Sequence, residues 1–140
     1  MRIVGLDLGS RRIGVAVSDS GGVLATPYSV IERSGDPAAD RARIADVVQE
    51  LEAGTVVVGL PLSLDGSRGP AATAAVAEVD ALREVLDVPV EVHDERLSTV
   101  SAHRSLTASG LKGSARRRKV VDQVAASVVL QSWLDRGATR

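Results

Sequence analysis

The sequence of 140 residues has no cysteine and only two aromatic residues, Tyr28 and Trp133. Without cysteine there can be no disulfide, thiol nucleophile or thiolate metal site. With so few aromatic rings, any binding of nucleic acid must rest on charge and backbone contacts rather than on base stacking. No stretch approaches the roughly 20 apolar residues of a membrane span, and the N-terminus lacks a signal-peptide pattern. We therefore expect a cytoplasmic protein that does not contact membranes.

The charges are unevenly distributed along the chain, although the net charge is only −1. Residues 1–95 carry eight Arg against sixteen Asp and Glu, whereas residues 96–140 carry nine Lys and Arg against two Asp. Such an asymmetry suggests a polyanionic partner for the basic segment. The alternative is that charges distant in sequence mix on the folded surface. The composition, 44% hydrophobic and 25% charged, is that of a single globular domain over residues 1–140.

The hydrophobic pattern predicts five strands alternating in part with four helices. The strands are expected at residues 2–8, 13–18, 24–32, 55–60 and 89–93. The helices are expected to begin at Pro37, Pro70, Ser98 and Lys119, with Gly54 ending the first of them and a basic loop over 110–118 preceding the last. The gap between the first two strands suits a hairpin. This order predicts an α/β fold: a mixed five-stranded sheet, its first three strands a meander, with helices on both faces.

One carboxylate interrupts the first strand. Asp7 stands within the apolar run Ile3–Leu8, which is typical of a strand buried on both faces. An ionised carboxylate there costs several kcal/mol unless it is paired or binds a cation. Asp7 is therefore either paired with an arginine or a ligand for something positive.

Two further carboxylates are candidates for the same site. Glu95 follows the fifth strand at its carboxyl end, where ligands gather in parallel sheets. In the last helix Gln123, Ser127, Gln131 and Asp135 form a polar stripe, and Asp122 falls on the opposite side, on the face of Ala125, Ala126 and Val129. Taken singly, Glu95 could be a solvated loop residue and Asp122 an acid favoured by the helix dipole.

Convergence of the three carboxylates would require a cation to offset their repulsion. Oxygen ligands, without cysteine or a histidine pattern, favour Mg²⁺ or Mn²⁺. Asp7, Glu95 and Asp122 could hold two such ions about 4 Å apart, an arrangement that hydrolyses phosphodiesters. For His93 we expect a packing or surface role, with a role as general base as the alternative.

Basic residues flank these carboxylates. Arg11 and Arg12 follow the first strand, and Gly9 lets a ligand approach its end closely. A second basic run precedes Asp122 and consists of Lys112, Arg116, Arg117, Arg118 and Lys119. Positive charge at a helix N-terminus opposes the macrodipole, so we interpret both groups as contacts to a phosphate backbone. The alternative for the second run is a solvated helix end.

Four blocks in this order resemble the YqgF/RuvX family, RNase H-like proteins described as Holliday junction resolvases or pre-16S rRNA processing nucleases. The blocks are residues 5–19, residues 58–70, residues 94–99 and residues 121–126. The resemblance implies an RNase H-like fold and a metal-dependent endonuclease whose carboxylate triad is Asp7, Glu95 and Asp122. Arg11 stands where lysine is common in the family.

The resemblance leaves the substrate open between pre-16S rRNA and branched DNA. Junction resolvases of this type often act as symmetric dimers, so a homodimer is a further expectation. Two alternatives from other classes are an ATP-binding protein of the actin-like or sugar-kinase-like type, in which Asp-x-Gly also follows a first strand, and a nucleic-acid-binding module without catalysis. Against the first, such proteins need two domains around the nucleotide.

Overall fold

The computed structural model describes residues 1–60, 69–94 and 115–138, and in the last of these segments it describes the side chains of residues 124–136. The expected helix from Ser98 and most of the loop after residue 60 lie outside these residues. Within the described part of the chain, no helix is both long enough and apolar enough to cross a membrane.

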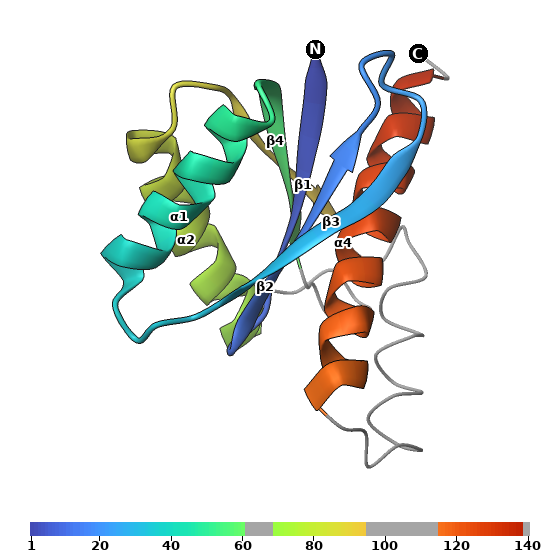
Figure 1. Cartoon of the computed structure of the whole chain (residues 1–140). Helices are drawn as coiled ribbons and strands as arrows, with labels where there is room; N and C mark the ends of the chain where they lie inside the picture. Colours follow the sequence, from blue (N-terminus) through green and yellow to red (C-terminus); the bar gives the residue numbers. More distant parts are fainter. Residues whose placement is uncertain (61–68, 95–114, 139–140) are drawn as a thin grey trace.

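A five-stranded mixed sheet forms the centre of the molecule (Figure 1). Its strands are β1 (Arg2–Leu8), β2 (Arg12–Ser18), β3 (Ala25–Glu32), β4 (Ala53–Leu60) and β5 (Val90–Asp94). The spatial order is β3-β2-β1-β4-β5. β1, β2 and β3 form an antiparallel meander, whereas β4 pairs parallel with β1 and with β5. The predicted meander and the mixed sheet are thus confirmed.

Helices cover both faces of the sheet, as the sequence predicts. The helices with described residues are α1 (Pro37–Glu50), α2 (Pro70–Val85) and α4 (Ala115–Ala138). α1 and α2 lie on one face, and α4 crosses the other (Figure 1). Asp36 caps α1 because its side chain accepts a hydrogen bond from the Ala38 amide, and proline occupies the start of both α1 and α2.

The two faces of the sheet are packed differently. Toward α1 and α2 the strands present large side chains, such as Leu6 and Ile13, which join the main core with Ile44 of α1 and Leu82 of α2. Toward α4 they present small residues. Ala16 packs there with Val57, Ala126, Leu130 and Leu134. The helix α4 can therefore approach the sheet closely.

The predicted end of the first helix is wrong. The sequence assigns Gly54 as its terminator, but α1 ends at Glu50 and is capped by Leu51. Glu52, not a glycine, adopts the left-handed conformation, with φ of 53°. Gly54 already lies in β4, where a Cβ would stand 2.9 Å from Met1 Sδ. Gly54 therefore packs against Met1 within β4 and does not cap the helix.

The predicted start of the last helix is also wrong. The sequence analysis begins it at Lys119 after a basic loop, whereas α4 begins at Ala115. Alanine, arginine and lysine have high intrinsic helix propensity, which outweighs the unfavourable placement of positive charge at the N-terminus. Residues 116–119 of the expected loop and helix start therefore belong to the first turns of α4.

Candidate active site at the carboxyl edge of the sheet

The three parallel strands end at one edge of the sheet. Leu6 of β1 aligns with Val58 of β4, and Val58 aligns with Val92 of β5. The residues that follow β1, β4 and β5 therefore leave the sheet at a common edge, which is where ligand sites form in parallel sheets. The turn after β1 and the N-terminal end of α4 lie at this same end of the molecule (Figure 1).

Asp7 lies at this edge and is only 2% exposed. Side chains alternate between faces along a strand. Val4 and Leu6 belong to the core formed with α1 and α2, whereas Gly5 contacts α4. Asp7 therefore shares the α4 face with Gly5. The prediction of a carboxylate within a strand covered on both faces is confirmed.

α4 packs closely against the strand that carries Asp7. A Cβ placed on Gly5 would lie 2.7 Å from Leu130 Cβ and 3.2 Å from the Ala126 carbonyl oxygen. In β2, the residue paired with Asp7 is Gly14, and the residue paired with Gly5 is Ala16. Gly5, Gly14 and Ala16 are small, so the backbone of α4 can approach the sheet closely beside Asp7.

The turn after β1 is tight. The Gly9 amide donates to the Asp7 carbonyl oxygen at 3.1 Å, and a Cβ on Gly9 would lie 2.6 Å from the Arg12 carbonyl oxygen. Arg11 is exposed and Arg12 is half-buried. The Arg12 carbonyl oxygen of the same turn is thus the group that lies close to Gly9, and the predicted approach of a ligand stays a prediction.

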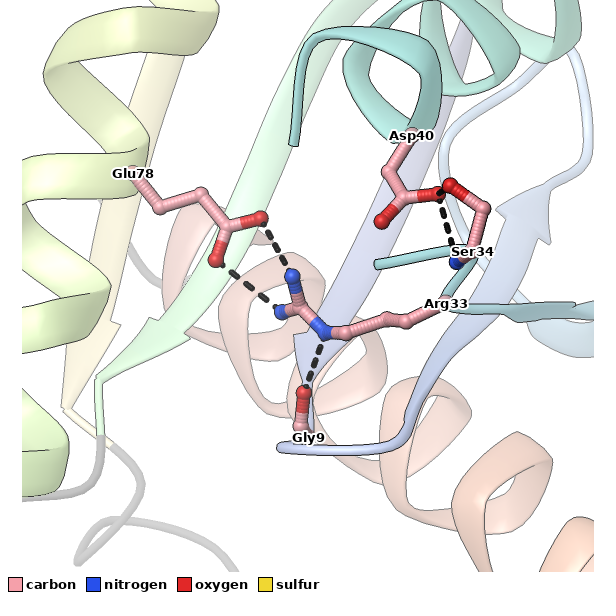
Figure 2. Close-up of polar contacts among 5 residues, drawn as sticks. All are labelled: Gly9, Arg33, Ser34, Asp40 and Glu78. Carbon is pink, nitrogen blue, oxygen red and sulfur yellow. Dashed lines mark hydrogen bonds and ion pairs between the residues drawn. The ribbon is translucent and has the colours of Figure 1, made fainter. Parts of the chain in front are cut away.

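An arginine that the sequence analysis does not single out holds this turn. Arg33 Nε donates to the Gly9 carbonyl oxygen at 2.7 Å. The two terminal nitrogens of the guanidinium donate to the two carboxylate oxygens of Glu78 in α2, each at 3.0 Å (Figure 2). The Arg33 amide also donates to the Arg11 carbonyl oxygen at 3.0 Å. One residue therefore connects the turn to α2.

The backbone beyond Arg33 is fixed by a second carboxylate (Figure 2). Asp40 Oδ1 accepts from the Ser34 amide at 3.0 Å and from the Ser34 hydroxyl at 2.8 Å. The Ser34 amide holds the pKa of Asp40 below its ordinary value, with the Ser34 hydroxyl and the charges of Arg33 and Arg43 acting in the same direction against desolvation. Asp40 therefore stays ionised and anchors the segment that carries Arg33.

Of the packing and surface roles expected for His93, the structure shows the packing role. His93 is 4% exposed, and its Nε2 lies 2.9 Å from Ser132 Oγ of α4. Burial lowers the pKa of His93, and the charge of Arg136 lowers it further, against an opposing effect of Asp94. The imidazole is therefore neutral at neutral pH and ties β5 to α4.

The remaining predicted site residues are described less completely. Asp122 belongs to α4, where its backbone but not its side chain is described, and the same holds for Arg116, Arg117, Arg118 and Lys119. Glu95 and Lys112 lie outside the described residues. Within the side chains that are described, no three Asp, Glu or His residues are grouped so that they could hold one metal ion. The carboxylate triad and its two-ion site stay a prediction.

The missed pair, Arg33 and Glu78, had no strong signal in the sequence. The two residues are 45 positions apart, and each stands in a segment rich in other charges. Charged residues in such segments are usually exposed to solvent. Only the folding of β3 and α2 around the carboxyl edge brings them together.

Comparison with known proteins supports the resemblance found in the sequence. The profile of the RuvX family, described as Holliday junction resolvase, matches residues 1–136. A protein of Nocardia farcinica named "Putative pre-16S rRNA nuclease" is 50% identical over 140 residues, covering 96% of this chain and 77% of that protein. A protein of the same name from Myxococcus xanthus is 50% identical over 135 residues, covering 96% and 88%.

Solved structures agree on the fold. RuvC of Thermus thermophilus in complex with a Holliday junction substrate matches with a TM-score of 0.60 at 18% identity, over 98% of this chain and 96% of that chain. The predicted RNase H-like fold is confirmed.

Proposed function

Because the chain belongs to the RuvX family, we propose that it is a metal-dependent endonuclease that cleaves phosphodiester bonds at the carboxyl edge of its sheet. The observation that carries this proposal is the burial of Asp7 on the α4 face, at the edge where β1, β4 and β5 end. A carboxylate there is costly to a fold and useful to an enzyme that needs a cation.

The described geometry is compatible with the other two members of the triad. Position 122 lies one helical turn before Ala126, whose carbonyl oxygen is next to Gly5. Asp7 is two residues beyond Gly5, toward the end where α4 begins (Figure 1). β5 ends at this edge with Asp94, the residue that precedes Glu95 in the sequence. In this proposal Asp7, Glu95 and Asp122 are the residues that would hold Mg²⁺ or Mn²⁺.

In this proposal some residues bind the cations or position water, and others bind the nucleic acid. When bound, the divalent ions polarise the phosphodiester and lower the pKa of water. Asp7 and Asp122 would hold the cations, and Glu95 would hold a cation or position the attacking water. Exposed Arg11, with the basic residues at the start of α4, binds the phosphate backbone and contributes little base specificity.

Precursor 16S rRNA is the substrate we favour, because the relatives that are about 50% identical carry that function in their names. We propose that the protein acts in the cytoplasm, where a ribosomal RNA precursor would be processed. A four-way DNA junction is the second candidate, favoured by the description of the family. Cutting two strands of a junction symmetrically would require a homodimer, so the oligomeric state on junction DNA separates the two candidates.

A cleavage assay on both substrates tests the proposal. The wild-type protein is incubated with precursor 16S rRNA or with four-way junction DNA in Mg²⁺, in Mn²⁺ and in EDTA. We expect cleavage of the precursor with either metal ion and none in EDTA. Absence of metal-dependent cleavage of both substrates would refute the proposal.

Asp7→Asn tests the role of the buried carboxylate. We expect cleavage to fall by at least about 100-fold, because the substitution removes the charge that binds the cation, while nucleic-acid binding is retained. Asp46→Asn is the matched control, since Asp46 is an exposed aspartate of α1, on the opposite face of the sheet. Mn²⁺ should also raise the melting temperature of the wild type and of Asp46→Asn but not of Asp7→Asn. Full cleavage by Asp7→Asn would exclude the mechanism.

A further inference from the structure

The side chain of Arg33 ties the turn between β1 and β2 to α2. Arg33 Nε binds the Gly9 carbonyl oxygen at 2.7 Å, two residues after Asp7, and both terminal nitrogens bind Glu78 at 3.0 Å (Figure 2). These are charge-assisted bonds in a bidentate arrangement, which is the stronger and more directional kind. The side chains of Arg33 and Glu78 are only 21% and 18% exposed, so solvent screens the pair incompletely.

The contacts of Arg33 are directed to the turn rather than to the core. Its amide extends the ladder of β2 and β3 by donating to Arg11, at the other end of the turn. The next residue, Ser34, is fixed by Asp40, which is 2% exposed. The backbone at Arg33 is therefore fixed. From the end of β3 its guanidinium extends to Glu78 of α2 and contacts the Gly9 carbonyl oxygen on the way.

We propose that Arg33, fixed by Glu78, is a positioning residue that holds the Gly9–Arg12 turn in the place where its donors meet the substrate phosphates. The proposal rests on the proposed function as far as the phosphates are concerned. The turn begins next to Asp7 and carries the exposed Arg11. A displacement of such a turn by about 1 Å can cost a factor of 100 in a rate.

The chain offers a matched control for the Arg33 clamp, the name we give to the hydrogen bonds from Arg33 to Gly9 and Glu78. Arg83 of α2 also binds one main-chain carbonyl, that of Val90, with Nε at 3.1 Å and a terminal nitrogen at 2.9 Å, and it contacts Asp80 at 3.4 Å. Val90 is the first residue of β5, at the opposite edge of the sheet from Asp7. Arg83→Gln therefore removes a similar set of contacts away from the site.

Hydrogen exchange measures the clamp directly, without cleavage or metal. In Arg33→Gln we expect the amides of residues 9–12 to exchange at least about tenfold faster than in the wild type, because the turn opens locally. Arg83→Gln should leave these amides unchanged. Arg33→Lys should resemble Arg33→Gln, because one ammonium group cannot bind Gly9 and both oxygens of Glu78 in the same geometry. Wild-type exchange in Arg33→Gln, or full protection in Arg33→Lys, would overturn the proposal.

Nucleic-acid binding in EDTA links the clamp to the substrate. We expect Arg33→Gln to weaken binding of the precursor RNA about tenfold, the size of a few lost phosphate contacts, and Arg83→Gln to bind as the wild type does. Arg11→Gln should weaken binding less in the Arg33→Gln background than in the wild type, since Arg11 is then already displaced. Full additivity of the two substitutions would overturn the role in substrate binding. If the wild type binds no nucleic acid, the proposed function fails while the exchange experiment still decides on the clamp.

Discussion

Replacement of Gly5 by alanine tests whether α4 is pressed against the strand that carries Asp7. The added Cβ would stand 2.7 Å from Leu130 Cβ and 3.2 Å from the Ala126 carbonyl oxygen. Carbon atoms in contact prefer separations of about 3.5–4.0 Å, so strand and helix must separate by about 1 Å. Neither neighbouring atom is the end of a flexible side chain, and both move only with the backbone of α4.

The expected loss of stability follows from this overpacking. Insertion of a methyl group into a well-packed core costs about 1–3 kcal/mol. With an unfolding entropy of about 2.1 cal/mol/K per residue, a chain of 140 residues loses about 3–4 °C of melting temperature per kcal/mol. Gly5→Ala should therefore melt about 3–10 °C below the wild type. Leu130→Ala cannot relieve the contact, because alanine keeps the Cβ that causes it.

Thermal unfolding followed by circular dichroism, together with urea unfolding, measures the effect. Gly21→Ala is the control, because a Cβ there meets Asp19 Oδ2 at 3.7 Å and Val23 Cγ2 at 4.0 Å, which are ordinary contacts. A melting temperature of Gly5→Ala within about 1 °C of that of Gly21→Ala would refute the close packing.

Two further predictions concern titration and the β2–β3 turn. The pKa of His93 is lowered in the folded protein, whereas in the unfolded chain it has its ordinary value of 6.5. Below pH 6.5 the unfolded chain therefore binds a proton at His93 more readily than the folded chain does. The free energy of unfolding should not change through His93 above pH 6.5 and should fall as the pH falls below it. Urea unfolding between pH 5 and 8 should show a smaller loss on acidification for His93→Gln than for the wild type, and equal losses would contradict this. Asp19 Oδ1 accepts from the amides of Val23 at 2.7 Å and Leu24 at 3.2 Å; Asp19→Ala should speed hydrogen exchange at these two amides and leave β5 unchanged, and unchanged protection at both would show that the turn does not depend on the carboxylate.

The sheet could be predicted from the sequence because its strands differ in how they are buried. β1 and β4 are covered on both faces and read as continuous apolar runs. The short gap between β1 and β2 could only be a hairpin. The boundary errors have local causes. Gly54 looked like a helix terminator, but Glu52 takes the left-handed conformation and the glycine makes room for Met1.

The site could be predicted only in part, for reasons that differ between residues. The burial of Asp7 was predictable because Asp7 stands within the apolar run of β1, whereas its role as a metal ligand stays a prediction. Arg33 and Glu78 were not, because each is an ordinary charged residue until β3 and α2 are placed in space. Gln131 belonged to the predicted polar stripe of the last helix, yet its side chain bonds the Val23 carbonyl and the Ala25 amide. A helical period separates polar from apolar positions, but it does not say which polar residue has a partner across the fold.

The packing around Asp7 links stability to the geometry of the site. On the α4 face, β1 and β2 present Gly5, Gly14 and Ala16, and the row of β1 ends with Asp7. Small residues are needed there because α4 comes close enough that a Cβ on Gly5 would overlap Leu130. A larger side chain in this row would lift α4 from the sheet and move position 122 away from Asp7 at the same time. On the face of α1 and α2, where Leu6 and Ile13 pack in a separate core, a change of similar volume would alter stability without moving α4. The two faces should therefore differ in how strongly a loss of stability is accompanied by a loss of cleavage.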